Sequence, residues 1–461
     1  MSSRDRREPR GDLWSRGQAQ RSTVPRGSLG DLATRPESYD PVSRLEWQSA
    51  NRLRFLAPVR YQRMLVDPLS FYRGAALLMA EDLARGVSTP LSVQLSGDAH
   101  LENFGIFMSP ERRLVFDVND FDETAPGPFE WDVKRLATSL AIAAEWLNFS
   151  EHQQVNIVAA AAREYQLAMR RFAGQTRLQV WYATLDVDSL SQELRGFFTE
   201  GQRERVSDVL RHAKGKTPHR VFADLLAASA EGPRIRTDLK FVTPLDELPD
   251  AEQASELVRR VLTGYDETLS SDRRELLKQF TFIEAARQVV GVGSVGTECF
   301  AVLLEGHDRR DPFFLQIKQA QSSVLMVARD EEMQLQPGER VVEGQRLMQA
   351  TPDFFLGWHT VNGSSGPRSF YVRQLYDHKA TVNVARMGAA HLKTYGEVCA
   401  WALARAHARS GQASFIAGYL GKNNDFGSAM VSFALAYRER NTSDFAALAR
   451  AAHRRRVVVA T

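Results

Sequence analysis

The sequence has little cysteine, no long apolar run and little net charge. Its two cysteines, Cys299 and Cys399, are too few for a disulfide framework or a cysteine-based zinc site. Their apolar surroundings predict buried free thiols. No uninterrupted stretch of about 18 apolar residues occurs, which argues against a membrane span. The formal net charge of +3 is too small to indicate a nucleic-acid-binding protein.

Large apolar residues are also scarce over residues 1–43, which are rich in arginine, serine and glycine. This composition predicts a flexible basic tail, with a nucleic-acid-binding arm as the less favoured alternative. The stretch lacks the apolar core of a secretory signal, so we expect a cytoplasmic protein. The whole chain is 43% hydrophobic and 25% charged, which is the balance of an ordinary globular protein. Its 461 residues predict two or three structural units.

What the chain does contain is an acidic turn early in its sequence. Asp98, His100 and Asn103 fall close together between two expected strands, and further aspartates, among them Asp117 and Asp120, follow. A carboxylate with an amide side chain shortly after it suits a loop that orients a hydroxyl group and holds a metal ion, as phosphoryl transfer requires. A solvated acidic turn is the plainer interpretation of one such residue, but the whole pattern favours a functional site.

A second pattern lies late in the chain, where Gly291, Gly293 and Gly296 follow the spacing G-x-G-x-x-G around Ser294. Dinucleotide-binding folds share this spacing but need a helix directly after the glycines. The residues that follow are instead apolar and strand-like, which predicts a hairpin that covers nucleotide phosphates as in protein kinases. The next expected strand ends at Lys318, which is either a phosphate-binding lysine or an exposed strand end.

Further residues are candidates for supporting roles. Glu343 lies on an expected helix after the lysine strand and is the preferred partner of Lys318, with Glu332 as its competitor. Asp132 begins another helix, where it either caps the helix or accepts hydrogen bonds from the backbone of the acidic turn. His407, near the end of a late helix, is expected to be a surface or capping group.

The segment GDAHLEN resembles the catalytic loop of aminoglycoside and choline kinase-like phosphotransferases, whose pattern is H-G-D-x-H-x-x-N, although Ser96 replaces the first histidine. NDFDE resembles their metal-binding strand end, with Asp120 as the preferred match because an aromatic residue follows it, and Asp117 as the alternative. FEWDVKRL resembles the helix start that anchors the loop. This resemblance implies that Asp98 orients or deprotonates a hydroxyl group, and that His100 belongs to the same catalytic loop.

The chain is also similar to a bacterial family of uncharacterised proteins, domain of unknown function 2252. The resemblance extends over roughly residues 55–440. It is carried by the segments GDAHLENFG, FDVNDFDET, FEWDVKRLA, VVGVGSVGT, EGQRLMQA and YVRQL. The family brings no established reaction with it.

Together these patterns predict an α+β protein with a two-lobed, protein-kinase-like fold. The catalytic loop precedes the glycine loop, which is the reverse of the order in ordinary kinases, so we expect a circular permutation. We expect four parts: a flexible tail at 1–43, a mainly helical lobe with the catalytic loop at 44–287, a β-rich nucleotide-binding lobe at 288–380, and C-terminal helices at 381–461 that return to the helical lobe.

The expected function is transfer of phosphate from ATP, with Mg²⁺, to a hydroxyl group of a small-molecule acceptor. A protein acceptor, or transfer of the nucleotide itself, remains open, and neither a membrane nor a nucleic acid is expected as a partner. Asn103 and Asp120 would hold the metal, and Lys318 would neutralise the phosphates. A nucleotide-binding module without turnover would keep every motif, whereas a metal-dependent phosphoesterase would need more histidine and aspartate ligands.

Overall fold

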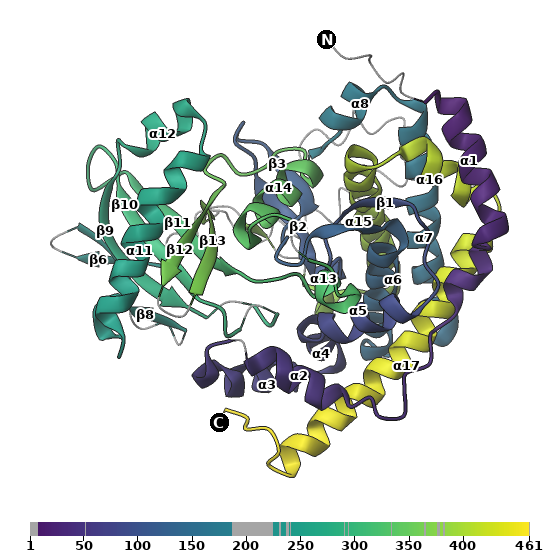
Figure 1. Cartoon of the computed structure of the whole chain (residues 1–461), viewed down its shortest axis with the longest axis horizontal. Coiled ribbons are helices and arrows are strands. Elements are labelled where there is room, and N and C mark those ends of the chain that lie inside the picture. Colours follow the sequence, from purple (N-terminus) through teal and green to yellow (C-terminus); the bar gives the residue numbers. More distant parts are fainter. Residues whose placement is uncertain are drawn as a thin grey trace.

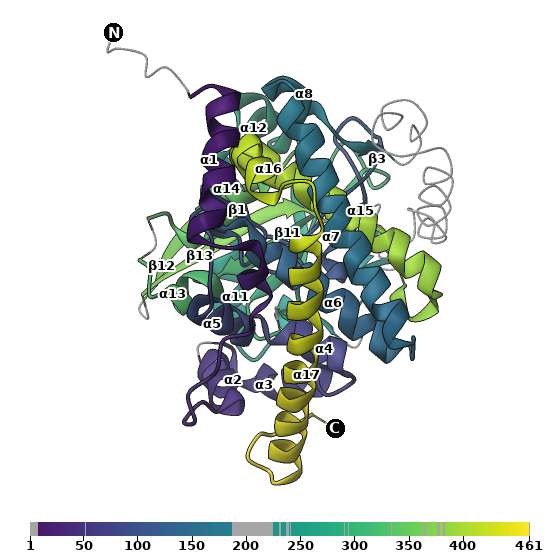
Figure 2. The same ribbon diagram turned by 90° about the vertical axis from the view of Figure 1, so that its right-hand side faces the viewer.

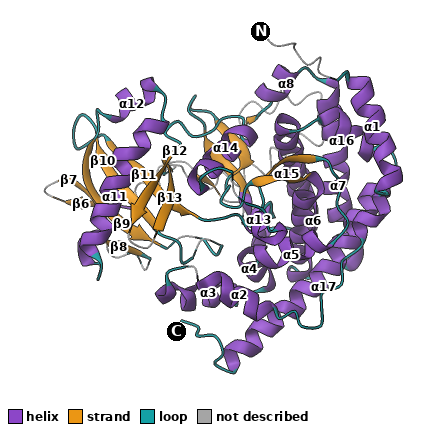
Figure 3. Ribbon diagram, in the orientation of Figure 1, coloured by secondary structure: helices purple, strands orange, loops and turns teal. Residues whose placement is uncertain are grey.

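The computed structural model has a strand-rich side and a helical side (Figure 1). It describes residues 8–50, 52–186, 225–229, 232–236, 239, 241–289, 291–293, 295–332, 334–363, 366–375, 379–380 and 383–460. The architecture is mixed α+β, with antiparallel sheets and many helices (Figure 3), which confirms the predicted fold class at this level.

The larger sheet has six strands in the order β12-β13-β11-β10-β9-β8, and all neighbours are antiparallel. The strands are β8 (Val242–Pro244), β9 (Thr281–Gln288), β10 (Cys299–Glu305), β11 (Pro312–Ala320), β12 (Gly357–Gly363) and β13 (Gly366–Gln374). The glycine segment therefore lies between β9 and β10, and Lys318 lies on β11.

This sheet begins earlier in the chain than the sequence predicted, because β8 ends at Pro244 and β9 begins at Thr281, both before residue 288. The expected boundary was too late for a physical reason. Strand β9 includes Ala285, Ala286 and Arg287, which favour helix when considered alone. Their pairing with β10 overrides that local preference.

Both faces of the six-stranded sheet are covered. Phe300 and Val302 of β10 pack against α11 on one face, and Ala301, on the opposite face, packs in an apolar cluster with Ile235. Because successive side chains of a strand point to opposite faces, the unbroken apolar run of β10 fits burial on both sides. The elements that cover the two faces include α11 (Ala251–Tyr265), β6 (Leu226–Ser229) and β7 (Gly232–Ile235).

A smaller sheet, in the order β14-β2-β3-β5, and the pair β1-β4 lie next to the long helices (Figure 1). The strands are β1 (Ser92–Leu95), β2 (Phe104–Met108), β3 (Leu114–Val118), β4 (Ala125–Pro128), β5 (Leu185–Asp186) and β14 (Lys379–Ala380). The acidic turn joins β1 to β2. Asp117 lies on β3, and Asp120 and Asp122, which we call the aspartate group, follow β3.

Long helices from both ends of the chain build the helical side. Helix α15 packs against α7, and α17 packs against α6 and α7, so C-terminal segments cover the helices that follow the acidic turn (Figure 2). These helices are α6 (Phe129–Trp146), α7 (Glu151–Gly174), α8 (Arg177–Tyr182), α15 (Ala389–Ser410), α16 (Ala413–Leu420) and α17 (Asp425–His453).

The prediction of a flexible tail over residues 1–43 is wrong for the described part of that stretch. Helix α1 (Arg10–Thr23) packs against α16, and Gly17 lets the backbones approach, since a side-chain carbon there would lie 2.1 Å from the Phe415 carbonyl oxygen. Arg21 and Arg26 donate hydrogen bonds to carbonyl groups at the end of α16. Backbone contacts and helix capping thus order a segment with few apolar residues.

Short helices before the acidic turn and after β11 bring the two sides together. Helix α13 packs against α5, and the Ser323 hydroxyl group donates a hydrogen bond to the Glu123 carbonyl oxygen at 2.7 Å. The elements are α2 (Pro41–Ala50), α3 (Ala57–Met64), α4 (Pro68–Gly74), α5 (Ala76–Arg85), α13 (Val324–Arg329) and α14 (Pro337–Met348). A further short helix, α12 (Ser271–Leu277), directly precedes β9.

Two predictions from composition can be compared with the structure. Cys299 and Cys399 are buried and free, as predicted. Among the described residues, no helix is both long and apolar enough to cross a membrane.

Candidate active site

The acidic turn, residues 96–103, begins in a conformation that requires glycine. Gly97 has a φ of 83°, and a side-chain carbon there would lie 2.0 Å from the Glu123 carbonyl oxygen. At the start of α6, the Asp132 carboxylate accepts hydrogen bonds from the backbone N–H groups of Ser96 at 2.7 Å and Gly97 at 3.0 Å. Of the two roles expected for Asp132, this is the second, and it fixes the backbone from which Asp98 projects.

His407 supports this anchor, and the prediction that it is a surface or capping group is wrong. Its ring is fully buried, with Nε2 3.2 Å from Asp132 Oδ2 and Nδ1 2.8 Å from the Tyr165 hydroxyl oxygen. The prediction failed because α15 stays buried through its last turn, where an isolated amphipathic helix would expose its end. Helices α6, α7 and α15 therefore meet behind the acidic turn.

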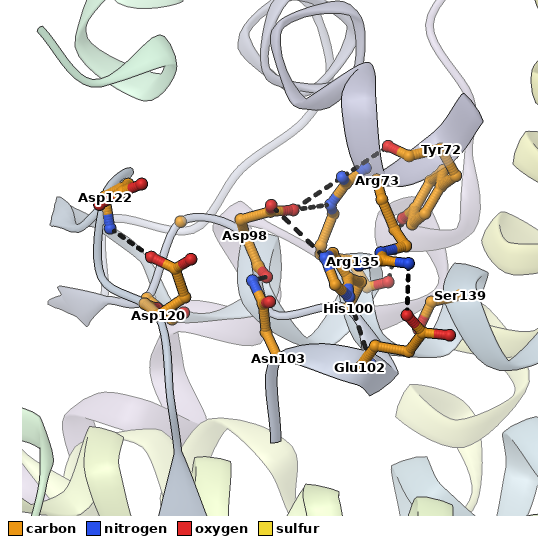
Figure 4. A network of polar contacts seen from close by, with 12 residues as sticks. Tyr72, Arg73, Asp98, His100, Glu102, Asn103, Asp120, Asp122, Arg135 and Ser139 are labelled. Carbon is orange, nitrogen blue, oxygen red and sulfur yellow. Dashed lines mark hydrogen bonds and ion pairs between the residues drawn. The ribbon is translucent and has the colours of Figure 1, made fainter. Parts of the chain in front are cut away.

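Asp98 is held by a buried arginine (Figure 4). Arg135 of α6 places Nε at 2.8 Å and a terminal nitrogen at 2.7 Å from the same carboxylate oxygen, Oδ1. The other oxygen, Oδ2, lies 3.6 Å from His100 Nε2. One oxygen is thus fixed by the guanidinium group, and the other can meet a hydroxyl group.

The His100 ring is neutral near neutral pH. Burial, followed by the charges of Arg73 and Arg135, lowers its pKa well below the ordinary value. Nδ1 accepts a hydrogen bond from the Glu102 backbone N–H at 3.2 Å, so the ring proton is on Nε2, which faces Asp98. His100 can therefore donate toward the Asp98 carboxylate without adding a second charge.

Asn103 and Asp120, the metal ligands expected from the sequence, both line the pocket described below. The Asn103 amide nitrogen donates to the Asp98 carbonyl oxygen at 2.7 Å, which turns the amide oxygen away from that carbonyl (Figure 4). The Asp120 side chain is 33% exposed, and its Oδ1 accepts a hydrogen bond from the Asp122 N–H at 3.1 Å. Mg²⁺ in nucleotide sites commonly uses one or two carboxylates and takes its other ligands from phosphates and water. Among the described residues, no group of three or more His, Cys, Asp or Glu side chains is arranged to hold a metal.

Asp117, the alternative metal ligand, lies elsewhere. Its buried carboxylate is 2.5 Å from the Arg405 guanidinium and accepts backbone hydrogen bonds from Val118 at 2.8 Å and Ala350 at 3.3 Å. Burial raises the pKa of Asp117, and the charge of Arg405 opposes that rise. This ion pair ties β3 to α15, and Asp120 is the aspartate of the two that reaches the pocket described below.

Lys318 points from β11 toward the aspartates that follow β3. Its ammonium group contacts Asp122 Oδ2 and lies 3.6 Å from Asp120 Oδ2, and its side chain is 3% exposed. The predicted pair with Glu343 does not form in this structure. Glu343 is 47% exposed and pairs with Arg346 at 2.9 Å, because α14 carries it on the face turned toward solvent.

The alternative partner of the lysine, Glu332, is also exposed, so neither predicted glutamate meets Lys318. Burial lowers the pKa of Lys318, but Asp120 and Asp122 raise it more, and the net shift is well above the ordinary value. Tyr371 completes the cluster, since its hydroxyl group donates to Asp122 Oδ1 at 2.7 Å. The lysine therefore stays charged inside the protein.

The glycine loop, residues 289–298, is fastened to the segment that precedes α3. Gly291 has a φ of 63° and Gly296 a φ of 93°, so both positions favour glycine. The Arg52 guanidinium donates to the carbonyl oxygens of Gly293 and Val295, and the backbone N–H of Leu53 donates to that of Gly296 at 2.7 Å. The loop is therefore tied to residues 52 and 53, and it lines a pocket together with the acidic turn.

One pocket joins the two parts of the chain, and we call it the catalytic pocket. It is lined by residues of the acidic turn, of the aspartate group after β3, of the glycine loop and of the end of β11. Its lining includes the predicted residues Asp98, His100, Asn103, Asp120, Gly291 and Gly293. Ser294, also predicted here, lies outside the described residues.

The lining also contains residues that the sequence did not single out, among them Arg52, Glu123 and Gln319–Ser322. Burial raises the pKa of Glu123 to about 7, although a hydrogen bond from the Val324 backbone N–H opposes that rise. Glu123 directly follows the aspartate group, so its position was the only sequence signal for its role. Arg52 carries no such signal, because its role depends on a contact with the distant glycine loop.

Comparison with known proteins gives one match. A family model described as "Uncharacterized protein conserved in bacteria (DUF2252)" matches residues 52–451. No curated protein and no solved structure matches.

Proposed function

The chain belongs to this bacterial family, DUF2252, as its sequence motifs predicted, and from its candidate active site we propose an ATP- and Mg²⁺-dependent phosphotransferase. The acceptor is a hydroxyl group, most simply on a small molecule. The observation that carries the proposal is that Lys318 contacts Asp122 and lies 3.6 Å from Asp120. Both aspartates line a pocket with Asp98 and Gly291, although Lys318 itself is not part of that lining. A lysine, a glycine loop and an acidic turn with an amide are the parts that phosphoryl transfer needs together.

The proposed fold is kinase-like and circularly permuted. In protein kinases a glycine-rich loop covers the phosphates, and the phosphate-binding lysine lies on the third strand. Here the glycine loop joins β9 to β10, and Lys318 lies on β11, the next strand. Helix α15 follows the strand-rich part in the chain but packs on α7, and it carries His407 to the anchor of the acidic turn. A late helix thus completes the early helical part, as a permutation requires.

The proposed reaction is a displacement at the terminal phosphorus of ATP. The acceptor oxygen bonds to that phosphorus while the bond to the bridging oxygen of the β-phosphate breaks, and ADP leaves with the electron pair. The hydroxyl proton passes to Asp98 Oδ2, the oxygen that Arg135 does not hold. Arg135 and the neutral His100 keep that carboxylate oriented toward the acceptor.

The remaining residues hold the nucleotide. Lys318 neutralises phosphate charge, and the backbone N–H groups of the glycine loop cover the phosphates. Asn103 and Asp120 would hold Mg²⁺, which supplies charge neutralisation at the phosphates when bound. Arg73 lines the same pocket, and its charge is already paired with Glu102 of the acidic turn at 2.5 Å.

A screen for ATP consumption tests this proposal. Purified full-length protein is mixed with ATP, Mg²⁺ and fractions of a bacterial metabolite extract, and ADP formation is measured for the parent and for Asp98→Ala. We expect at least one fraction to support ADP formation by the parent and none to support it in the variant. Equal ADP formation by both proteins would contradict the roles proposed here.

A nucleotide-binding module without turnover is a second candidate, and one observation favours it. Active protein kinases pair the phosphate-binding lysine with a helix glutamate. Lys318 instead contacts Asp122, and Glu343 faces solvent. ATP binding by the parent without ADP formation in any fraction would favour this candidate.

A further inference from the structure

We propose that the nucleoside of the donor nucleotide binds in a second pocket, which lies between α2, the end of β11 and the start of α14. We call it the nucleoside pocket. Its lining includes Trp47, Gln48, Gln336, Thr360 and Ser369. The inference rests on the proposed function and adds to it, because it locates the base and sugar of the nucleotide and not only its phosphates.

The nucleoside pocket is continuous with the catalytic pocket. Arg52, Glu123 and Gln319–Ser322 line both of them. A nucleotide whose phosphates lie beneath the glycine loop therefore has a direct path for its nucleoside past these shared residues. The same path keeps the terminal phosphate beside Asp98 and Asp120, which line only the first of the two pockets.

The other route from the glycine loop, beneath the middle of the six-stranded sheet, is filled by the protein itself. Ala301 and Phe314 pack there in an apolar cluster with Ile235. Further along the same face, buried Arg373 donates to the Gln316 side chain at 3.0 Å. Arg373 also donates to the Asn119 carbonyl oxygen at 3.3 Å, which closes the space between the sheet and the aspartate group. A base could enter there only by displacing these buried contacts.

The chemistry of the nucleoside pocket suits a flat base and a sugar. The Trp47 indole is 43% exposed, and the Arg44 guanidinium lies over its ring at 4.7 Å. Arg44 is fixed in turn by an ion pair with Glu81 at 2.6 Å, so one face of the ring is covered and the other can stack on a base. The Gln48 amide oxygen accepts a hydrogen bond from Arg60, which leaves the Gln48 NH₂ group to donate to a base or to a ribose hydroxyl group. The Gln336 side chain also lines the pocket and caps the start of α14.

Arg52 lines both pockets, at the place where the phosphates of the nucleotide would join its nucleoside. One of its terminal nitrogens donates to the Gly293 and Val295 carbonyl oxygens, and its buried Nε has no hydrogen-bond partner. Glu298 pairs with Arg368 at 2.7 Å, so the charge of Arg368, also in the pocket lining, is already balanced. The phosphate end of the pocket thus holds the Arg52 cation together with the carboxyl group of Glu123, and the other lining groups are mainly neutral.

Calorimetric titration of the full-length protein tests this placement with two ligands, ATP and inorganic tripolyphosphate, each with Mg²⁺. Trp47→Leu removes the stacking surface, so we expect the Kd of ATP to rise about tenfold. The Kd of tripolyphosphate should not change, because that ligand has no base. Trp47→Phe should keep most of the ATP affinity. Trp146→Leu is the matched control, since Trp146 is 39% exposed at the end of α6, and it should bind ATP like the parent.

The outcomes separate this inference from the proposed function. If the parent binds ATP and Trp47→Leu binds it equally well, the nucleoside pocket is wrong and the phosphotransferase proposal stands. Equal weakening of ATP and tripolyphosphate by Trp47→Leu also overturns the inference. A change confined to the KM of an acceptor would mean that the pocket holds the acceptor, which again overturns it. A parent that binds no ATP removes the proposed function together with the inference.

Discussion

Lys318 and Asp120 are far apart in the sequence, yet the lysine Nζ lies 3.6 Å from the aspartate Oδ2. Each belongs to a different part of the chain, Lys318 to the six-stranded sheet and Asp120 to the aspartate group that follows β3. The contact depends on α13, which returns the chain from β11 to the helical side and packs against α5. A cation of the sheet and a carboxylate of the aspartate group therefore meet beside the pocket that Asp120 lines.

The ion pair of Lys318 predicts a measurable loss of stability. Lys318→Met removes the buried cation that contacts Asp122 and lies beside Asp120, so these two partly exposed carboxylates are left to repel each other. We expect the free energy of unfolding in urea to fall by roughly 3 kcal/mol. Lys318→Met combined with Asp122→Asn should recover part of that loss. Lys278→Met is the control, because the Lys278 side chain is 59% exposed, and full stability of Lys318→Met would contradict the pairing.

The hydrogen bonds that hold the acidic turn to Asp132 predict a second loss of stability. Asp132→Ala leaves the backbone N–H groups of Ser96 and Gly97 without their acceptor, and each unmade buried hydrogen bond is costly. We expect the free energy of unfolding to fall by roughly 3 kcal/mol. Asp132→Asn keeps one acceptor oxygen and should lose less. Asp12→Ala, an exposed aspartate in the first turn of α1, should change little, and equal effects of the two alanine variants would argue against the anchor.

The carboxyl group of Glu123 predicts a pH-dependent effect on stability. Burial raises its pKa in the folded protein to about 7, above the ordinary value for glutamate of about 4.3. The stability that this group contributes is therefore present below about pH 4.3 and is lost as the pH rises through about 7. Without ligand, the free energy of unfolding of Glu123→Gln relative to that of the parent should increase by roughly 2 kcal/mol as the pH rises from 5 to 8. Urea titrations at each pH measure this difference, and Glu343→Gln, at an exposed site, is the control that should show no such increase. A difference between Glu123→Gln and the parent that does not change with pH would contradict the raised pKa of Glu123.

The contact of Arg52 with the glycine loop predicts a change in local opening. Arg52→Ala removes the hydrogen bonds to the Gly293 and Val295 carbonyl oxygens. We expect the amide hydrogens of Leu53 and Val295, which donate to the Gly296 and Val292 carbonyl oxygens, to exchange roughly tenfold faster, as the loss of one or two hydrogen bonds implies. Arg54→Ala replaces an exposed neighbour and should leave these rates unchanged. Unchanged exchange in Arg52→Ala would mean that other contacts hold the loop.

The sequence was sufficient to identify the residues whose role is set by neighbours close in the chain. Asp98, His100 and Asn103 share one turn, so their spacing fixed their relation before the structure was known. Gly291 and Gly296 adopt positive φ values that few other residues tolerate, and this constraint is also local. The α+β class and the family followed from patterns of the same kind.

Contacts across the fold could not be derived in this way. Several acidic residues were candidate ion-pair partners of Lys318. Asp122 is the partner, and not Glu343, because the sheet lies close to the aspartate group in the folded chain. His407 is buried because α7 and α6 cover the last turn of α15, which its own helical pattern does not reveal. Helix α1 is ordered by the close approach that Gly17 permits to α16, whereas composition alone indicated flexibility.

The measurement that tests the central claim most directly is the affinity for ATP with Mg²⁺, titrated into the full-length parent, Asp98→Ala and Lys318→Ala. Circular dichroism would first establish that each variant is folded. The account predicts that the parent binds ATP, that Asp98→Ala binds it with similar affinity but forms no ADP, and that Lys318→Ala binds at least about tenfold more weakly. ATP binding by Lys318→Ala at the affinity of the parent, or no binding by the parent, would contradict a shared nucleotide site.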